Sequence, residues 1–349
     1  MRKLVTIRQI KSINPIKDAD FIEVATIDGW NVVVKKGEFK AGDSCVYFEI
    51  DSIIPRKDWN EFLADKNNPE KPIRLKTITF KGQISQGLAL PLKTVFPETI
   101  DSLNIGDDVT DMIGVEKYIP PVPACLSGEV RGKIPFPVTD EERIQNIPEI
   151  IDIFKGVDVY ISQKIDGTST SFGLVRSDDG ESTDFHVCGR NWSYKDTVDN
   201  TYWEMAKKYN VEEILRGLSE KTGVSNWAIQ GETYGQGIQG NKLKIQGHEF
   251  ALFNVLMRGI KYDWMNPDEE YYDIVSEFLS DIPKVRVLYK GEFIWNSVEE
   301  LLEFADTFNY PNGSIGEGIV IRPIKRFVSA NGYTSFKVIS NKFLKKYKE

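Results

Sequence analysis

The chain has 349 residues, a formal net charge of −8 at neutral pH, 41% hydrophobic residues and 11% aromatic residues. This composition is typical of a globular protein of about two domains, and it excludes a disordered chain. The three cysteines, Cys45, Cys125 and Cys188, form neither a disulfide framework nor a metal-binding pair, and they fit a reducing cytoplasm. No segment has the length and apolarity of a signal peptide or a membrane span, so we expect an intracellular protein without a membrane partner.

Residues 1–118 contain short runs rich in β-branched and aromatic residues, which predict strands. Turn signals separate the runs, among them Asp28-Gly29, Lys36-Gly37 and Lys81-Gly82. The expected strands cover residues 4–16, 21–27, 30–35, 44–49, 74–80 and 86–91. Several short strands at this spacing predict a small β-barrel of the OB type.

Residues 119–139 contain five prolines and two glycines, which predict a linker between two domains. The second domain, residues 140–349, mixes strands and helices irregularly, so the predicted fold class is α+β. Its strands are expected at 158–163, 170–176, 185–188, 227–233, 249–257, 285–289, 318–322 and 335–339. Helices are expected after Asp199 and Asn210, at 268–279 and at 297–308. Ser297 is the expected N-cap of the last of these, with Glu300 three residues on.

The last 25 residues are basic although the chain is acidic. Lys325 to Glu349 contain seven basic residues and one acidic residue. Such a stretch can bind phosphates, but a solvated C-terminal helix has the same composition. Charge alone favours the solvated helix.

Lys164 follows a predicted strand, in the string Lys164-Ile165-Asp166-Gly167. A lysine amine attacks a phosphorus atom only when it is neutral, and a nearby metal ion or burial lowers its pKa toward that state. A turn with a solvated lysine explains the same four residues. The string alone therefore leaves both interpretations open.

Two glutamates, Glu232 and Glu317, lie beside glycines at the ends of predicted strands. Glycines let a backbone approach a ligand closely. Together with Asp166, these carboxylates are suited to a hard divalent cation. Taken singly, each is also explained as an exposed acid at a strand end.

Further candidates are suited to a nucleotide. Lys337 and Arg190 can contact phosphates, and Phe253 can stack on a base, although core packing is the simpler explanation of a phenylalanine.

The order of these residues is more informative than any one of them. Lys164, Arg190, Glu232, Phe253, Glu317 and Lys337 occur in the order used by the covalent nucleotidyltransferases, which the chain resembles. That superfamily comprises ATP-dependent DNA and RNA ligases and mRNA capping enzymes. Within it, the chain is most similar to RNA ligases with an N-terminal OB module, the fifth type of RNA ligase. The similarity lies in the strings 29–30, 42–43, 48–52, 139–146 and 237–240. DNA ligases and capping enzymes usually place an OB domain after the catalytic domain, and only twelve residues follow Lys337.

The resemblance implies an OB-type barrel followed by a nucleotidyltransferase domain and a three-step reaction. Lys164 takes AMP from ATP, AMP passes to an RNA 5′-phosphate, and a 3′-hydroxyl displaces it. DNA-containing nicks are further possible substrates, and a monomer is expected. The implied cofactors are ATP and Mn²⁺ or Mg²⁺.

The resemblance also implies a role for each site residue. Asp166, Glu232 and Glu317 would hold the metal ion, directly or through its waters, or contact the ribose. Phe253, Gln163 and Ile165 would bind the nucleotide, with Phe253 stacked on adenine. Arg143, Arg190 and Lys337 would contact phosphates. Many members carry a second lysine where this chain has Ile339, and Lys342 or Lys345 is a candidate replacement.

Two other functions share parts of this pattern. A capping-type guanylyltransferase uses the same lysine chemistry with GTP. A catalytically inactive RNA-binding protein would keep the OB module but take no label from any nucleotide.

Overall fold

The computed structural model describes residues 3–68, 71–98, 102–119, 129–139, 141–177, 182–196, 200–325 and 335–347. The chain divides into two compact units, residues 1–121 with 341–349, and residues 122–340. Residues 120–128 of the predicted linker, which include Cys125, lie outside the described residues, as do Asp199, Arg326 and Lys348. Within the described residues, no helix has the length and apolarity needed to cross a membrane.

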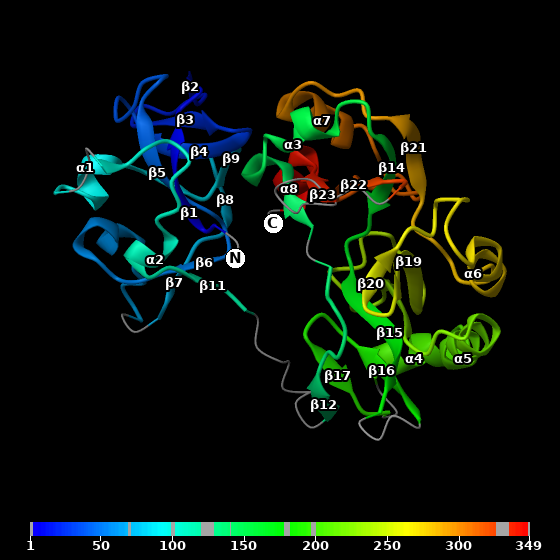
Figure 1. The fold of residues 1–349 in the computed structure, drawn as a ribbon. Coiled ribbons are helices and arrows are strands. Elements are labelled where there is room, and N and C mark those ends of the chain that lie inside the picture. The colour runs from blue at the N-terminus through cyan, green and yellow to red at the C-terminus, as the bar shows by residue number, and fades with distance from the viewer. Residues whose placement is uncertain are drawn as a thin grey trace. The chain divides into compact units, whose positions relative to one another are not determined.

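The first unit consists of short antiparallel strands (Figure 1). One sheet has the order β1-β5-β10, formed by Val5–Gln9, Ser44–Phe48 and Leu88–Pro91. A second is the meander of β2, β3 and β4, formed by Ser12–Pro15, Ile22–Ile27 and Trp30–Lys35. A third has the order β11-β6-β7, formed by Glu116–Lys117, Ser52–Ile54 and Ile73–Arg74. The hairpin of β8 (Thr77–Phe80) and β9 (Gln83–Gln86) lies beside β4, because the amide of Val33 donates to Ser85 Oγ at 2.9 Å.

Two predicted turns have the geometry of tight hairpins. Asp28 and Gly29 have φ of 47° and 83°, and Lys81 and Gly82 have φ of 46° and 80°. Both central residues of each turn are left-handed, as a two-residue turn matching the strand twist requires. The predicted run at 4–16 forms two strands instead of one, because the chain passes from one sheet to another at the buried Ile10.

Short helices complete the first unit: a 3₁₀ helix at Asp58–Leu63, α1 at Leu92–Val95, α2 at Thr110–Ile113 and α8 at Asn341–Tyr347. The basic end of the chain does form a helix, α8. Its Phe343 and Leu344 are buried, whereas Lys342, Lys345 and Lys346 are exposed. By their contacts, residues 341–349 belong to the first unit, whereas the sequence analysis assigned them to the second domain, residues 140–349. The buried apolar side of α8 explains why this basic helix packs against the protein.

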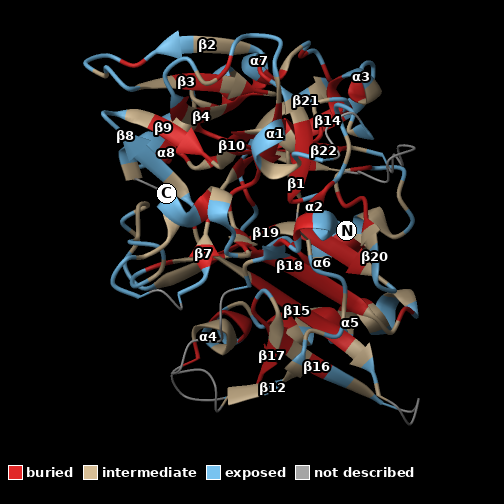
Figure 2. Cartoon of the chain, turned by 90° about the vertical axis from the view of Figure 1, so that its left-hand side faces the viewer, coloured by how far each residue is buried: buried red, intermediate tan, exposed pale blue. Residues whose placement is uncertain are grey.

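The second unit contains two sheets. The larger has the order β12-β17-β16-β15-β18-β19-β20, and every pairing in it is antiparallel. Its strands are Val130–Lys133, Trp192–Tyr194, Thr183–Cys188, Thr168–Arg176, Trp227–Gly235, His248–Met257 and Ile260–Tyr262. The smaller has the order β13-β23-β22-β14-β21, formed by Glu142–Arg143, Phe336–Ile339, Gly318–Pro323, Asp158–Lys164 and Val287–Glu292. Figure 2 shows β15 and β18 as largely buried strands.

Helices cover one face of each sheet and form separate cores. Helices α4 (Thr201–Lys208), α5 (Val211–Thr222) and α6 (Tyr272–Phe278) pack on the larger sheet. A 3₁₀ helix (Ile144–Asn146), α3 (Ile150–Phe154) and α7 (Val298–Ala305) pack on the smaller one. The predicted cap of α7 is confirmed, since Ser297 Oγ accepts the amide of Glu300 at 3.2 Å. Apart from the parallel pair β13–β23, the strands of both sheets pair antiparallel, and their mixture with helices is the predicted α+β class.

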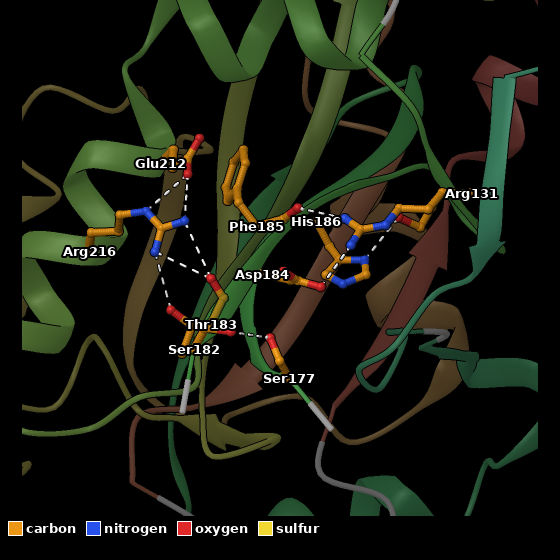
Figure 3. Close-up of polar contacts among 10 residues, drawn as sticks. Arg131, Ser177, Ser182, Thr183, Asp184, Phe185, His186, Glu212 and Arg216 are labelled. Carbon is orange, nitrogen blue, oxygen red and sulfur yellow. Dashed lines mark hydrogen bonds and ion pairs between the residues drawn. The ribbon is translucent and has the colours of Figure 1, made fainter. Parts of the chain in front are cut away.

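Part of the predicted linker belongs to the larger sheet. Val130–Lys133 is the edge strand β12, and Arg131 donates to the Phe185 carbonyl at 3.1 Å and to Asp184 at 2.8 Å (Figure 3). On the other side of β16, Arg216 of α5 donates to Thr183 Oγ1 at 3.2 Å. The linker predicted at residues 119–139 is therefore too long, because an edge strand that contains glycine cannot be told from a linker by composition.

A buried ion pair fixes the start of the smaller sheet. Arg322 of β22 donates to Glu141 at 2.7 Å and to Ser162 of β14 at 3.1 Å, with the two charged side chains 3% and 13% exposed. Burial alone would raise the pKa of Glu141, but Arg322, with smaller contributions from Lys337 and Lys261, holds it below the usual range.

The substitution Glu141→Gln tests this ion pair. Because the folded pKa is depressed, the carboxylate stabilises the fold fully above the usual glutamate pKa of 4.5. This contribution is lost as the pH falls through the folded pKa. We expect a loss of about 3 kcal/mol in the free energy of unfolding at pH 7, and a smaller loss at pH 3.5. Urea unfolding at both pH values measures the difference. Asp268→Asn, in a surface pair with Lys325, is the control and should leave stability unchanged. Equal losses at both pH values for Glu141→Gln would contradict the assignment.

Candidate active site

The pairing of β14 with β22 brings Lys164 and Glu317 together. Lys164 is the last residue of β14 and pairs with Gly318 of β22, directly after Glu317. A side chain at position 318 would place its Cβ 2.1 Å from the Val338 carbonyl, so only glycine allows β23 this close. The hydrogen-bonded pairing of β14 with β22 thus brings together two residues that lie far apart in the sequence.

Lys164 Nζ lies 2.7 Å from Glu317 Oε2, with the two side chains 25% and 15% exposed. Burial lowers the pKa of the amine, but Glu317, Glu232 and Asp166 together raise it above the usual lysine value. The amine is therefore an ammonium ion in this state, and it must lose a proton before it can act as a nucleophile.

Gly167 lets the lysine turn lie against Glu232. A Cβ at position 167 would stand 2.4 Å from the Thr233 carbonyl and 2.8 Å from Glu232 Cγ. In the same region Ser169 of β15 pairs with Glu232 of β18. The glycine of the Lys-x-Asp-Gly string is thus explained by a close approach between two strands.

Glu232 is the acid whose charge is hardest to maintain. Burial raises its pKa to about 8, and repulsion from Glu317 and Asp166 acts in the same direction. Lys164 and Arg190 oppose this rise but do not cancel it. At Lys164 the attraction of the three acids outweighs the effect of burial, whereas at Glu232 burial and the neighbouring acids outweigh the attraction of Lys164 and Arg190.

Asp166 is bound by a lysine that the sequence analysis did not single out. Lys242 Nζ lies 2.6 Å from Asp166 Oδ2, and the two side chains are 9% and 8% exposed. Lys242 belongs to the loop between β18 and β19, after the Gly237–Gly240 string noted in the sequence. A lysine in a glycine-rich loop has no sequence pattern that would predict its contact with Asp166.

Tyr310 joins the two halves of the site. Its buried hydroxyl accepts the amides of Asp166 at 2.9 Å and Glu317 at 3.2 Å, and it donates to the Lys164 carbonyl at 3.2 Å. One hydroxyl thus satisfies three backbone groups on both sides of the Lys164–Glu317 pair. This role also escaped the sequence, because a tyrosine in a loop has no periodic pattern.

Alternation along the smaller sheet separates a polar face from the core. On β13, β14, β22 and β23, the residues in register with Lys164 on the same face are Tyr160, Ser162, Gly318, Val320, Arg322, Lys337, Ile339 and Arg143. The opposite face carries Ile161, Ile319, Ile321, Phe336 and Val338, all in the core under α7. Arg143 and Lys337 are direct neighbours across β13 and β23. This face therefore places three cations, Arg143, Arg322 and Lys337, on the same side of the sheet as the amine.

The remaining predicted residues lie around this face. Ile165 and Phe253 share a small apolar cluster, and the Arg322 guanidinium lies 5.3 Å from the centroid of the Phe253 ring. Gln163 alternates to the other side of β14, where its amide donates to the Asn309 carbonyl at 3.1 Å. Arg190 is exposed after β16 and acts on the charge of Glu232.

The three acids are not arranged as direct ligands of one ion. Among the residues that the structure describes, no group of three or more His, Cys, Asp or Glu side chains is close enough to hold a metal. Glu317 and Asp166 each contact a lysine instead. The prediction of a metal at these residues remains a prediction, and contact through the ion's waters is the form consistent with this geometry.

Comparison with known proteins assigns both parts of the chain. A family model described as an OB-fold domain matches residues 4–92, and a model described as RNA ligase matches residues 157–339. No curated protein sequence is similar enough to count as a match.

Solved structures of Naegleria gruberi RNA ligase are similar over the whole chain. The structure with PPi is 36% identical, with a TM-score of 0.79, and the match covers 100% of this chain and 99% of that one. A glutamate-to-alanine mutant with AMP and Mn has 36% identity, a TM-score of 0.80 and 99% coverage of both chains. A lysine-to-alanine mutant with ATP and Mn has 36% identity and a TM-score of 0.79, with 99% coverage of both chains.

Tyr310→Phe tests the hydroxyl that joins the site. Removing it leaves two buried amides and a carbonyl without this partner, so we expect a loss of about 2 kcal/mol in the free energy of unfolding. Amide hydrogen exchange at Asp166 and Glu317 should also accelerate. Tyr289→Phe is the matched control, because that hydroxyl donates to a carbonyl at the surface. Unchanged exchange at both amides would show that Tyr310 does not hold them.

Proposed function

The chain belongs to the RNA ligase family, and from this we propose that it joins a 3′-hydroxyl end of RNA to a 5′-phosphate end. ATP supplies the AMP, and Lys164 carries it as a covalent lysyl-AMP. One observation carries the assignment of the nucleophile. Lys164 is the lysine whose amine contacts Glu317 and is close enough to Glu232 and Asp166 for all three acids to shift its pKa.

The first step forms a bond between Lys164 Nζ and the α-phosphorus and breaks the bond to pyrophosphate. The amine loses its ammonium proton, and pyrophosphate leaves with the electron pair of the broken bond. AMP then passes from Nζ to the 5′-phosphate of an RNA end. In the last step the 3′-hydroxyl attacks that phosphate, AMP leaves, and a phosphodiester remains.

The predicted residues around Lys164 have corresponding tasks. Arg143 and Lys337 bind the phosphates, because their pairing places two cations on the same side of the sheet as the amine. Phe253 stacks on adenine beside Ile165. Gln163 binds the nucleobase edge from the segment that leads to Lys164, and Arg190 contacts phosphate near Glu232.

The site suits Mn²⁺ or Mg²⁺, as the relatives crystallised with Mn suggest. Its donors are the hard carboxylate oxygens of three acids, which together raise the pKa of Lys164. A bound divalent cation supplies positive charge that favours the neutral amine and balances the α-phosphate. Asp166, Glu232 and Glu317 would hold it through its waters.

Lys164→Ala tests the nucleophile. We expect covalent labelling by ATP labelled at the α-phosphate to fall below detection, because no other group replaces the amine. Labelled protein on a denaturing gel measures this. Lys290→Ala is the control, since Lys290 is an exposed lysine on the neighbouring strand β21. A Lys164→Ala protein that still forms covalent AMP would rule out the assignment.

The same assay with different nucleotides separates the other functions. Labelling by GTP in place of ATP would identify a capping-type enzyme. No labelling of the wild-type protein by any nucleotide, in either metal, would favour an inactive RNA-binding protein.

The OB module is proposed to hold the strand that ends in the 3′-hydroxyl. It contributes none of the residues assigned above to nucleotide chemistry, which all lie in the second unit, residues 122–340. The first step therefore needs only the second unit, and sealing needs both. One chain contains the whole set, so a monomer suffices.

A protein limited to residues 122–340 tests this division. It removes α8 together with the barrel, because the buried Phe343 and Leu344 belong to the first unit. We expect lysyl-AMP formation to persist and sealing of a nicked duplex to fall by about 100-fold or more, with RNA on the 3′-hydroxyl side. A nick with DNA on that side shows whether DNA is also accepted. Sealing at the full-length rate would refute the role of the barrel. A folding check by circular dichroism accompanies both assays.

A further inference from the structure

Lys242 is the feature of the site that neither the sequence analysis nor the proposed reaction uses. Its Nζ donates to Asp166 Oδ2 at 2.6 Å and to the Gln239 carbonyl at 3.0 Å. Both members of the ion pair are more than nine-tenths buried. Burial of two charges is costly unless they are paired, so this contact is a fixed part of the folded structure and differs from an exposed surface ion pair.

The loop that carries Lys242 is held in place from several sides. The Asn241 side chain donates to the Ile245 carbonyl at 2.8 Å and accepts the Ile245 amide at 3.0 Å. The Lys242 carbonyl accepts the side-chain amide of Asn312 at 2.9 Å, which links the loop to the segment after Tyr310. Three non-glycine loop residues, Gln239, Asn241 and Lys244, adopt positive φ of 45°, 46° and 55°. The loop therefore presents Lys242 in a fixed position.

The charges explain what such a lysine contributes. Before reaction, Lys164 is paired with Glu317, and Lys242 is paired with Asp166. When AMP is attached, Lys164 loses its positive charge while the three acids remain. Lys242 would still contact Asp166 in that state.

We propose that Lys242 is a positioning residue for the first step. It holds the Asp166 carboxylate in position throughout the transfer of AMP through their buried contact, and it is not displaced when nucleotide binds. The proposal rests on the proposed function, since it concerns the same lysyl-AMP. It assigns to the loop between β18 and β19 a role in the rate of transfer and not in the binding of ATP.

The test compares three variants in single-turnover formation of lysyl-AMP, with ATP and Mn²⁺ varied in turn. Lys242→Met should lower the rate constant at saturation by about tenfold or more and change half-saturation by ATP less than about threefold. Lys242→Arg, which keeps the charge, should stay within about threefold of wild type. Lys244→Met is the matched control, because Lys244 is exposed on the same loop, and it should match wild type.

A double-mutant cycle with Asp166→Asn identifies the partner. If Lys242 acts through Asp166, Lys242→Met should cost less than about twofold in the Asp166→Asn background. A full tenfold loss in that background would overturn the proposal. So would a faster reaction or a lower half-saturation for Mn²⁺ in Lys242→Met, since either result would make Lys242 a competitor of the metal. Where Lys242→Met does not fold, Lys242→Gln provides the same comparison. Failure of the wild-type protein to take up AMP would instead overturn the proposed function itself.

Discussion

The site depends on the balance of charge around one buried amine. Glu317, Glu232 and Asp166 act together on Lys164, and burial, with smaller contributions from the repulsion of Glu317 and Asp166, raises the pKa of Glu232 to about 8. Such a group of acids is unstable alone in a low-dielectric interior. Two lysines, Lys164 and Lys242, balance the negative charge of these acids. Lys164 is the proposed nucleophile and loses its positive charge during the reaction. A divalent cation held there, as proposed above, would supply the positive charge that Lys164 gives up.

The backbone ladder of the smaller sheet gives this balance its geometry. The register of β14 against β22 places Lys164 beside Gly318, and β22 against β23 places Lys337 beside Val320. Alternation then sends every second side chain into the core beneath α7, where residues such as Ile161, Ile319 and Val338 are fully buried. A slip of one residue would bury the lysines and expose the core. The same packing that stabilises the sheet thus fixes the direction of the amine.

Loops supply the parts that the ladder does not. Tyr310 holds the backbone on both sides of the Lys164–Glu317 pair, and Lys242 holds the carboxylate of Asp166. Both side chains are buried and are tied to neighbouring loops or strands. The rigid sheets provide position, and the loops provide charge and hydrogen bonds between them.

The sequence by itself determined the fold class, most of the strands, the N-cap at Ser297 and six ordered residues that include Lys164, Glu232 and Glu317. These follow from local patterns, namely alternation, turn residues and short strings, which need no partner to be recognised. Among the elements that it missed are β6, β11, β12, β13, β17, β20 and α3, because these elements are short and exist only by pairing or packing with other segments. Only the tertiary structure decided that Tyr310 and Lys242 belong to the site and that residues 341–349 pack with the first unit. The reason is physical: contacts between residues far apart in the chain depend on sheet register and loop closure, and no single segment encodes them.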